Sequence, residues 1–224
     1  MDKYAGDKIR NIALASHSGS GKTSVVESML FNAKVITRIG NVEEGNTASD
    51  YEQEEIKRKT SIQSSLFPFD WKGHKLNLID TPGYADYIGE LLSGIWASDG
   101  IVMIVSAVAG VEAGTEQVWD QIKHAKKPAA IFVNKMDREN ADFLKVLEGL
   151  RNKFGRLCVP IALPIGKEST FEGVIDLLNQ KEVPSSMTDQ VRDFEEGLIE
   201  VVAETNDVLS DKYLENGGLS GSEI

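Results

Sequence analysis

The stretch of sequence that decides the fold is Ile9-Arg10-Asn11-Ile12-Ala13-Leu14-Ala15-Ser16-His17-Ser18-Gly19-Ser20-Gly21-Lys22-Thr23. Residues 9–15 are mostly apolar, which predicts a buried strand. After Thr23, apolar residues recur at helical spacing, so residues 16–21 link a strand to a helix. The glycines at positions 19 and 21 let successive backbone N–H groups point at one anion, beside the positive end of the helix. The stretch therefore predicts a phosphate-binding loop.

The residue types in this loop predict a site for a nucleoside triphosphate and Mg²⁺. Lys22 is expected to reach the β- and γ-phosphates, and the Thr23 hydroxyl to bind Mg²⁺. Ser16 stands where the strict pattern has glycine, and the alternative interpretation is a glycine–serine turn that happens to precede a helix. The residues expected to contact nucleotide here are Ser16, His17, Ser18, Gly19, Ser20, Gly21, Lys22, Thr23 and Ser24.

Outward from this loop, short apolar runs alternate with amphipathic stretches. Further strands are expected at residues 62–69, 75–79, 101–105 and 129–133, and helices around residues 25–30, 87–96, 118–125 and 143–150. This alternation predicts an α/β fold of the P-loop NTPase class, with a mostly parallel central sheet and helices on both faces. A polar stretch, residues 33–60, interrupts the pattern, and a connection of that length is usually functional or mobile.

A second motif, Asp80-Thr81-Pro82-Gly83, follows the predicted strand at residues 75–79. A carboxylate at such a strand end can hold Mg²⁺ through water. The Gly83 N–H can approach a γ-phosphate closely, because glycine has no Cβ. As an isolated tetrapeptide the motif is equally a plain turn. Its position directly after a buried strand favours the nucleotide-binding interpretation.

A third motif, Asn134-Lys135-Met136-Asp137, follows the predicted strand at residues 129–133. The Asp137 carboxylate can accept hydrogen bonds from N1–H and the exocyclic amino group of guanine. Adenine has no such donor pair and would leave the carboxylate unpaired. Asn134 is expected to tie this loop to the phosphate loop, and the Lys135 stem to cover the base. The motif therefore predicts guanine and argues against an ATP-using kinase of the same fold class.

The order of these three motifs resembles that of the translational GTPases, and most closely the N-terminal domain of bacterial elongation factor G with its inserted subdomain. The resemblance runs over nearly the whole chain, and Phe171-Glu172-Gly173-Val174-Ile175-Asp176-Leu177 is similar to the start of that insert. It implies binding of GTP and GDP with Mg²⁺, and hydrolysis of GTP on the ribosome. Residues 50–62 are similar to the family's first switch, which becomes ordered around the γ-phosphate and Mg²⁺.

The resemblance also implies roles for single residues, with departures. Lys22, Gly83 and Tyr84 fall at the catalytic positions, but the family has His where Tyr84 stands, and a phenol is a poor substitute for imidazole. Ser61 falls where the family has a Mg²⁺-binding Thr, so the implied metal-binding residues are Thr23, Ser61 and Asp80. Gly19 replaces an Asp linked to monovalent-cation binding. These departures predict a divergent relative of the housekeeping factor, with two candidate functions: a GTPase, or a GTP-dependent switch with little hydrolysis.

The predicted domains are a GTP-binding core at residues 1–158, lacking the family's last strand, and a small, acidic, incomplete α+β insert at residues 159–224, with helices expected at about residues 189–205 and 207–215. The chain is accordingly expected to be a fragment of a longer protein. Residues 168–224 hold 14 acidic and 3 basic residues, so they carry the whole net charge of −11. This acidic surface is either a solvated helical face or a docking surface for a basic partner. It predicts no direct nucleic-acid site, because phosphate contacts need Lys and Arg.

Composition fits an ordinary globular protein, with 41% hydrophobic and 26% charged residues among 224. Apolar runs are too short to span a membrane, no secretory leader is recognisable, and a single cysteine, Cys158, cannot form an internal disulfide. We therefore expect a cytoplasmic protein with a buried, inert Cys158. Trp96 and Trp119 fall on apolar helical stripes and are expected in the core.

Overall fold

The computed structural model describes residues 4–179 and 182–224. The chain divides into two compact units, Met1–Lys135 and Met136–Ile224, and each is described by itself. The domain boundary expected from the sequence at residue 158 stays a prediction. Residues 180 and 181 of the predicted insert lie outside the described residues.

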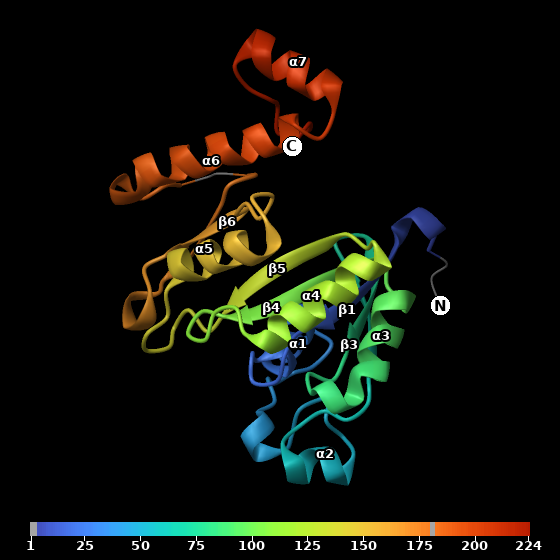
Figure 1. The fold of residues 1–224 in the computed structure, drawn as a ribbon. Helices are drawn as coiled ribbons and strands as arrows, with labels where there is room; N and C mark the ends of the chain where they lie inside the picture. The colour runs from blue at the N-terminus through green and yellow to red at the C-terminus, as the bar shows by residue number, and fades with distance from the viewer. Residues whose placement is uncertain (1–3, 180–181) are drawn as a thin grey trace. The chain divides into compact units, whose positions relative to one another are not determined.

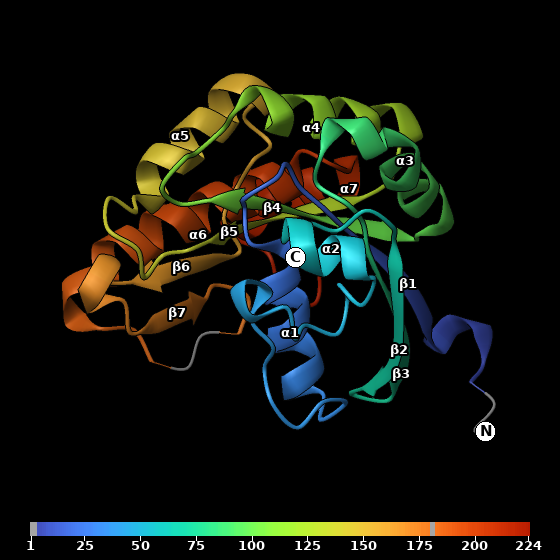
Figure 2. The same ribbon diagram turned by 90° about the horizontal axis from the view of Figure 1, so that it is seen from below.

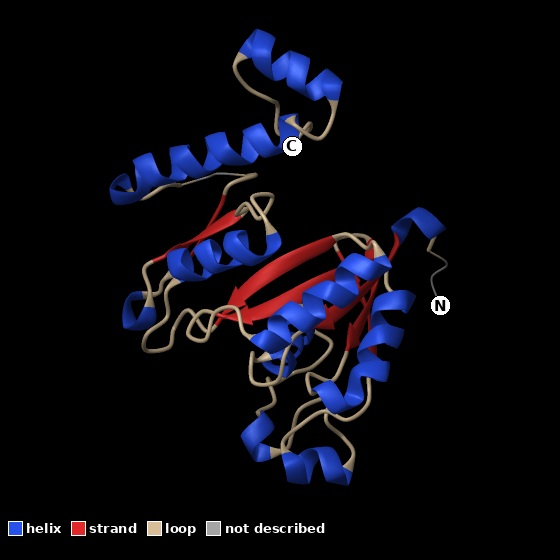
Figure 3. Ribbon diagram, viewed as in Figure 1, coloured by secondary structure: helices blue, strands red, loops and turns tan. Residues whose placement is uncertain are grey.

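The first unit is built on a five-stranded sheet in the order β2-β3-β1-β4-β5 (Figure 1, Figure 3). The strands are β1 (Ile9–Ala15), β2 (Ser65–Trp71), β3 (His74–Asp80), β4 (Gly100–Ser106) and β5 (Ala129–Asn134). The pairs β1–β3, β1–β4 and β4–β5 are parallel, while β2 joins β3 as an antiparallel hairpin at the edge. The predicted mostly parallel sheet is therefore confirmed. Because β1 lies at its centre, the loop after β1 opens at the carboxyl edge where ligands of such sheets bind.

Helices cover both faces of this sheet, as predicted: α1 packs on one face, and α3 and α4 pack on the other (Figure 2). Their bounds are α1 (Lys22–Asn32), α3 (Ile88–Ala97) and α4 (Ala113–Ala125). The polar stretch predicted as a long connection also contains structure, a short helix α2 (Gln53–Arg58) and a single turn at Val42–Glu44. Further single turns of helix occur at Gly6–Lys8 and Ala85–Tyr87 and, in the second unit, at Glu168–Thr170 and Ser185–Met187.

The core between α1 and the sheet consists of aliphatic side chains with one aromatic ring. Its buried members are Leu14, Val26, Leu30, Phe69, Leu78 and Ile104. On the opposite face, Leu91 and Ile95 of α3 and Val118 and Ile122 of α4 are also buried. Burial of such side chains stabilises the fold by about 1.5–3 kcal/mol each, relative to exposure.

Two expectations about the core fail. Trp96 is 67% exposed, although it lies on an apolar stripe of α3. The helix instead buries the face that carries Leu91 and Ile95, and one residue further along rotates Trp96 about 100° away from it. Trp119 is half-buried rather than a core residue. Helical spacing grouped Trp96 with Leu91 and Ile95 in one apolar stripe and did not say which part of it faces the sheet.

The second unit begins with helix α5 (Phe143–Phe154) and a two-stranded antiparallel sheet of β6 (Ala162–Ile165) and β7 (Gly173–Asp176). Helices α6 (Thr188–Ala203) and α7 (Asp207–Asn216) follow, in orange and red in Figure 1. The core of this unit lies between the small sheet and α6 and is formed by Leu163, Ile175, Leu177, Val191 and Leu198, with Phe143 of α5 packed against it. The predicted small α+β unit and its two helices are thereby confirmed.

Candidate nucleotide-binding site

The loop between β1 and α1 has the backbone that a phosphate-binding loop requires. Gly19 (φ 81°) and Gly21 (φ 89°) both take the left-handed conformation, which side chains disfavour. A Cβ on Gly21 would also lie 2.5 Å from Nδ2 of Asn134. Glycine at position 21 is therefore fixed both by the turn and by the neighbouring loop.

Lys22 and Asp80 meet at the start of α1 and the end of β3. The Lys22 Nζ lies 3.1 Å from Oδ1 of Asp80, and both side chains are buried. The contact is an ion pair without hydrogen-bond geometry, and in the described part of the chain neither Asp80 carboxylate oxygen has a hydrogen-bond partner. A buried carboxylate is costly without such partners. Lys22 offsets its charge, and carboxylate oxygens without hydrogen-bond partners fit a divalent cation.

The polar stretch brings a second carboxylate and a hydroxyl to the same end of the sheet. Ser61 donates a hydrogen bond of 2.6 Å from Oγ to Oδ1 of Asp50, and both residues are buried. Burial raises the pKa of Asp50, although the Ser61 hydrogen bond opposes this. The negative charge of Asp80 raises the Asp50 pKa further, whereas Lys22 lowers it. Ser65 pairs with Asp80 across the β2–β3 hairpin and donates from Oγ to the Ser49 carbonyl oxygen at 3.0 Å, which brings Asp50 close to Asp80.

These residues fit Mg²⁺. The hydroxyls of Thr23 and Ser61 and the carboxylates of Asp50 and Asp80 are hard oxygen donors, as Mg²⁺ prefers, and phosphate oxygens would complete the set. No group of three or more His, Cys, Asp or Glu side chains suited to a metal occurs in residues 4–179 and 182–224. Hydroxyl and phosphate oxygens would therefore supply much of the coordination. The sequence placed residues 50–62 in a switch but gave Asp50 no role, because a single acidic residue in a polar stretch carries no signal.

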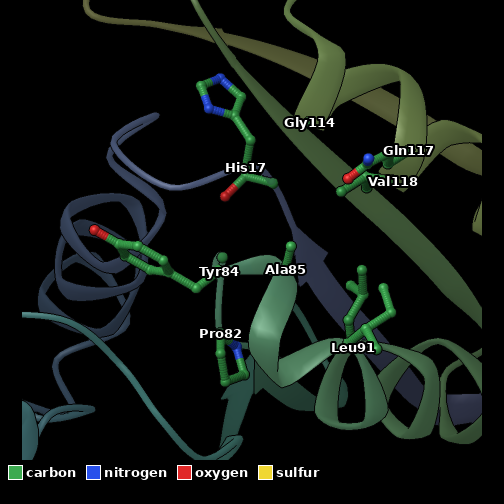
Figure 4. Close-up of a pocket in the computed structure, with 11 residues that line it drawn as sticks. His17, Pro82, Tyr84, Ala85, Leu91, Gly114, Gln117 and Val118 are labelled. Atoms are coloured by element: carbon green, nitrogen blue, oxygen red, sulfur yellow. The ribbon is translucent and has the colours of Figure 1, made fainter.

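Gly83 and Tyr84 follow Asp80 and border a small cavity beside the phosphate loop. A Cβ on Gly83 would lie 3.1 Å from both the His17 carbonyl carbon and the Ser18 nitrogen, so this segment packs directly on the loop backbone. The cavity is lined by Pro82, Ala85 and Leu91 on one side and by Gln117 and Val118 of α4 on another (Figure 4). Tyr84 is 48% exposed, and its ring points away from the cavity in Figure 4.

His17 connects the phosphate loop to the start of α4. Its Nδ1 lies 2.7 Å from the Ser18 carbonyl oxygen, and its Nε2 lies 2.9 Å from Oε2 of Glu112. A Cβ on Gly114 would lie 2.7 Å from the His17 Cβ, so the contact depends on glycine there. The sequence allowed either a phosphate contact or a packing role for His17, and in this structure both ring nitrogens face protein groups.

The third motif fastens onto the phosphate loop through its first two residues. Asn134 donates from Nδ2 to the Ser20 carbonyl oxygen at 3.0 Å, and Lys135 donates from Nζ to the Gly19 carbonyl oxygen at 2.6 Å. The expected tie between Asn134 and the loop is thus present. Asp137 belongs to the second unit, where its carboxylate is exposed and lies 3.7 Å from Nε of Arg138.

The remaining predicted residues of the loop differ in exposure. Ser16 and Ser20 are buried, and in the described residues neither hydroxyl has a hydrogen-bond partner. Ser18 and Ser24 are exposed, and Thr23 is half-buried. Of the two buried serines, Ser16 borders the cavity next to Gly83 and Tyr84, whereas Ser18 and Ser24 face solvent.

Two buried glutamates near the site were not identified from the sequence. Glu27 of α1 is 1% exposed and accepts hydrogen bonds from the backbone N–H groups of Gly40 (2.6 Å) and Ala48 (2.5 Å). Glu55 of α2, also 1% exposed, accepts from the N–H groups of Ile62 and Gln63. Both carboxylates stabilise the conformation of the polar stretch through hydrogen bonds to its backbone. Helical spacing places Glu27 beside core positions, and this was the one available signal.

Comparison with known proteins agrees with this geometry. The family described as elongation factor Tu GTP binding domain matches residues 7–217. A crystal structure of a protein from Thermus thermophilus is similar with a TM-score of 0.89 and 34% sequence identity. The similarity covers 97% of this chain and 34% of that one, so this chain spans about a third of the length of the Thermus protein.

Proposed function

Because this chain belongs to the elongation factor Tu GTP-binding domain family, we propose that it is the GTP-binding part of a translational GTPase of elongation factor G type. The observation that supports this best is the convergence of Lys22 and Asp80 with the Asp50–Ser61 pair at the carboxyl edge of the sheet, where Ser65 pairs with Asp80 and bonds to Ser49. The proposed reaction is hydrolysis of GTP to GDP and phosphate on the ribosome.

In the proposed reaction the protein acts by position and charge rather than by covalent chemistry. The backbone N–H groups of the phosphate loop and the Lys22 ammonium bind the β- and γ-phosphates. The Gly83 N–H faces the γ-phosphate, and the Tyr84 hydroxyl orients the attacking water. Thr23, Ser61 and Asp80 would hold Mg²⁺, with Asp50 beside them. When bound, Mg²⁺ supplies positive charge that offsets the charge on the phosphate oxygens.

Base selection is proposed for the third motif. Asp137 accepts from guanine N1–H and the exocyclic amino group, and Asn134 and Lys135 hold the phosphate loop to the strand that precedes them. Tighter binding of ADP than GDP would instead support an ATP-using kinase.

The competing candidate is a GTP-dependent binding switch that hydrolyses very slowly. Tyr84 favours it, because a half-exposed phenol replaces the imidazole expected at this position. Both candidates share the nucleotide site and differ in turnover alone. The ribosome, and a basic partner for the acidic second unit, are the proposed partners, with cytoplasm as the proposed location. No helix in the described part of the chain is long and apolar enough to cross a membrane.

Single-turnover GTP hydrolysis, measured with and without ribosomes for wild type and Tyr84→His, separates the two candidates. The GTPase proposal predicts that ribosomes accelerate wild-type hydrolysis by several orders of magnitude, as partners do for GTPases of this design. Wild-type turnover that stays at the intrinsic rate on ribosomes, together with a large gain in Tyr84→His, supports the switch instead. Because the ribosome contacts of such factors extend over other domains, the experiment uses the longest available form of the protein.

A further inference from the structure

Three successive backbone N–H groups directly after Ser61 are held by carboxylates. Glu55 Oε1 accepts from the N–H of Ile62 at 2.8 Å and from that of Gln63 at 3.1 Å. The next N–H, that of Ser64, donates instead to Oε2 of Glu90 at 2.9 Å. A longer contact of 3.5 Å joins the Ser64 hydroxyl to the Glu90 carbonyl oxygen. The chain that carries Ser61 is thus held by carboxylates from two different helices.

Glu90 belongs to the element that carries the other half of the site. It is the third residue of α3, which begins four residues after Tyr84 and five after Gly83. Tyr84, the turn Ala85–Tyr87 and the first turn of α3 are hydrogen-bonded in sequence, because the Tyr87 N–H donates to the Tyr84 carbonyl oxygen. Glu90 therefore lies on an element that continues directly from Gly83 and Tyr84. In its place near the helix N-terminus, the Glu90 carboxylate is also favoured by the helix dipole.

The opposite end of the polar stretch is tied elsewhere. Glu27 binds the N–H groups of Gly40 and Ala48 to α1, which begins at Lys22. Glu55 of α2 accepts hydrogen bonds from the N–H groups of Glu52 and Ile62, so it joins two parts of the same stretch to each other. The hydrogen bonds of Ser64 to Glu90 join the described residues 33–64 to α3.

We propose that Glu90 is a positioning residue that couples the placement of Ser61 to that of Gly83 and Tyr84. The proposal rests on the proposed function, because it assumes that both segments meet at the γ-phosphate and Mg²⁺. A ligand with a γ-phosphate contacts both segments, so it gains affinity when one hydrogen bond holds them in register. GDP lacks the γ-phosphate and gains nothing from that register. Glu90 therefore acts on the preference for GTP over GDP, not on binding of the nucleotide as such.

The test measures the affinities of a non-hydrolysable GTP analogue and of GDP, both with Mg²⁺, for wild type and variants of this chain. Glu90→Ala removes the acceptor. We expect the affinity for the analogue to fall about tenfold, because the free energy of a hydrogen bond to a charged group corresponds to about that change in affinity. The affinity for GDP is expected to change less than twofold. Glu90→Gln keeps one oxygen acceptor and is expected to lie between, with a loss of about threefold. Ser64→Ala keeps the N–H and is expected to resemble wild type.

A second readout follows the order of the segment itself. Trypsin sites at the exposed residues Arg38, Lys57 and Arg58 report whether residues 33–60 are held in place. The analogue is expected to protect these sites in wild type and to lose that protection in Glu90→Ala, whereas cleavage with GDP stays equal in both. Glu148→Ala, at an exposed position on α5 of the second unit, is the matched control and should behave as wild type.

The possible results distinguish failure of the Glu90 coupling from failure of the proposed function. Wild type that binds GDP and the analogue, with an unchanged ratio in Glu90→Ala, overturns the coupling and leaves the proposed function standing. An equal loss of both nucleotides assigns Glu90 a merely structural role and overturns the coupling as well. If Glu90→Ala does not fold, Glu90→Gln decides by its expected threefold change. Wild type that binds neither guanine nucleotide removes the proposed function and the inference together.

Discussion

At the scale of single residues, the site is organised by glycines that permit close approach and by carboxylates that lack full pairing. Gly19 and Gly21 turn the phosphate loop, and Gly83 lets a second backbone segment pack on it. Asp80 keeps two oxygens without a hydrogen-bond partner in the described residues, and Lys22 offsets its charge. This combination suits a highly charged ligand that arrives with a cation.

Gly83 offers a test of the close approach between the two backbone segments. In Gly83→Ala the new Cβ would meet backbone atoms of His17 and Ser18 at 3.1 Å, so one segment must shift. We expect affinity for a GTP analogue to fall about tenfold, with GDP binding changed little, as competition with a fluorescent nucleotide would measure. Gly89→Ala is the control, because its Cβ meets nothing within 4 Å and alanine favours helix. Equal analogue binding by both variants would contradict a role for the Gly83 approach.

At the scale of elements, helix α3 both packs against the sheet and carries a residue that binds the polar stretch. One face buries Leu91 and Ile95 against the sheet, its first turn carries Glu90, and its last turn exposes Trp96. Sequence spacing identified the helix but assigned Trp96 to the core. The reason is that residues 88, 92 and 96 and residues 91 and 95 both recur at helical intervals, and tertiary contacts alone choose between two such stripes.

Adjacent substitutions on α3 test this choice. Ile95 is fully buried, so Ile95→Ala is expected to lower the free energy of unfolding by about 2–5 kcal/mol. Trp96 is 67% exposed, so Trp96→Ala is expected to cost less than about 1 kcal/mol despite the larger side chain. Urea unfolding followed by circular dichroism measures both. A larger loss for Trp96→Ala than for Ile95→Ala would place the wrong face of α3 against the sheet.

At the scale of the whole molecule, the fold class was predictable and the fine structure of the polar stretch was not. The strands β1, β3, β4 and β5 are mostly apolar runs that are followed directly by polar residues, so their hydrophobic pattern was sufficient to predict them. The tie between Asn134 and the phosphate loop followed from the order of the motifs. Glu55 and Glu90 were missed because they bind backbone N–H groups outside their own helices, and such hydrogen bonds follow no sequence period.

Calorimetric titration with GDP and separately with ADP, both with Mg²⁺, decides whether this chain carries a guanine nucleotide site. A melting curve on the same sample establishes that the protein is folded. We expect GDP binding to exceed ADP binding by up to about 10⁴-fold, because adenine would leave the Asp137 carboxylate proposed for guanine unpaired. Equal binding of ADP and GDP, or no GDP binding by a folded sample, would contradict it.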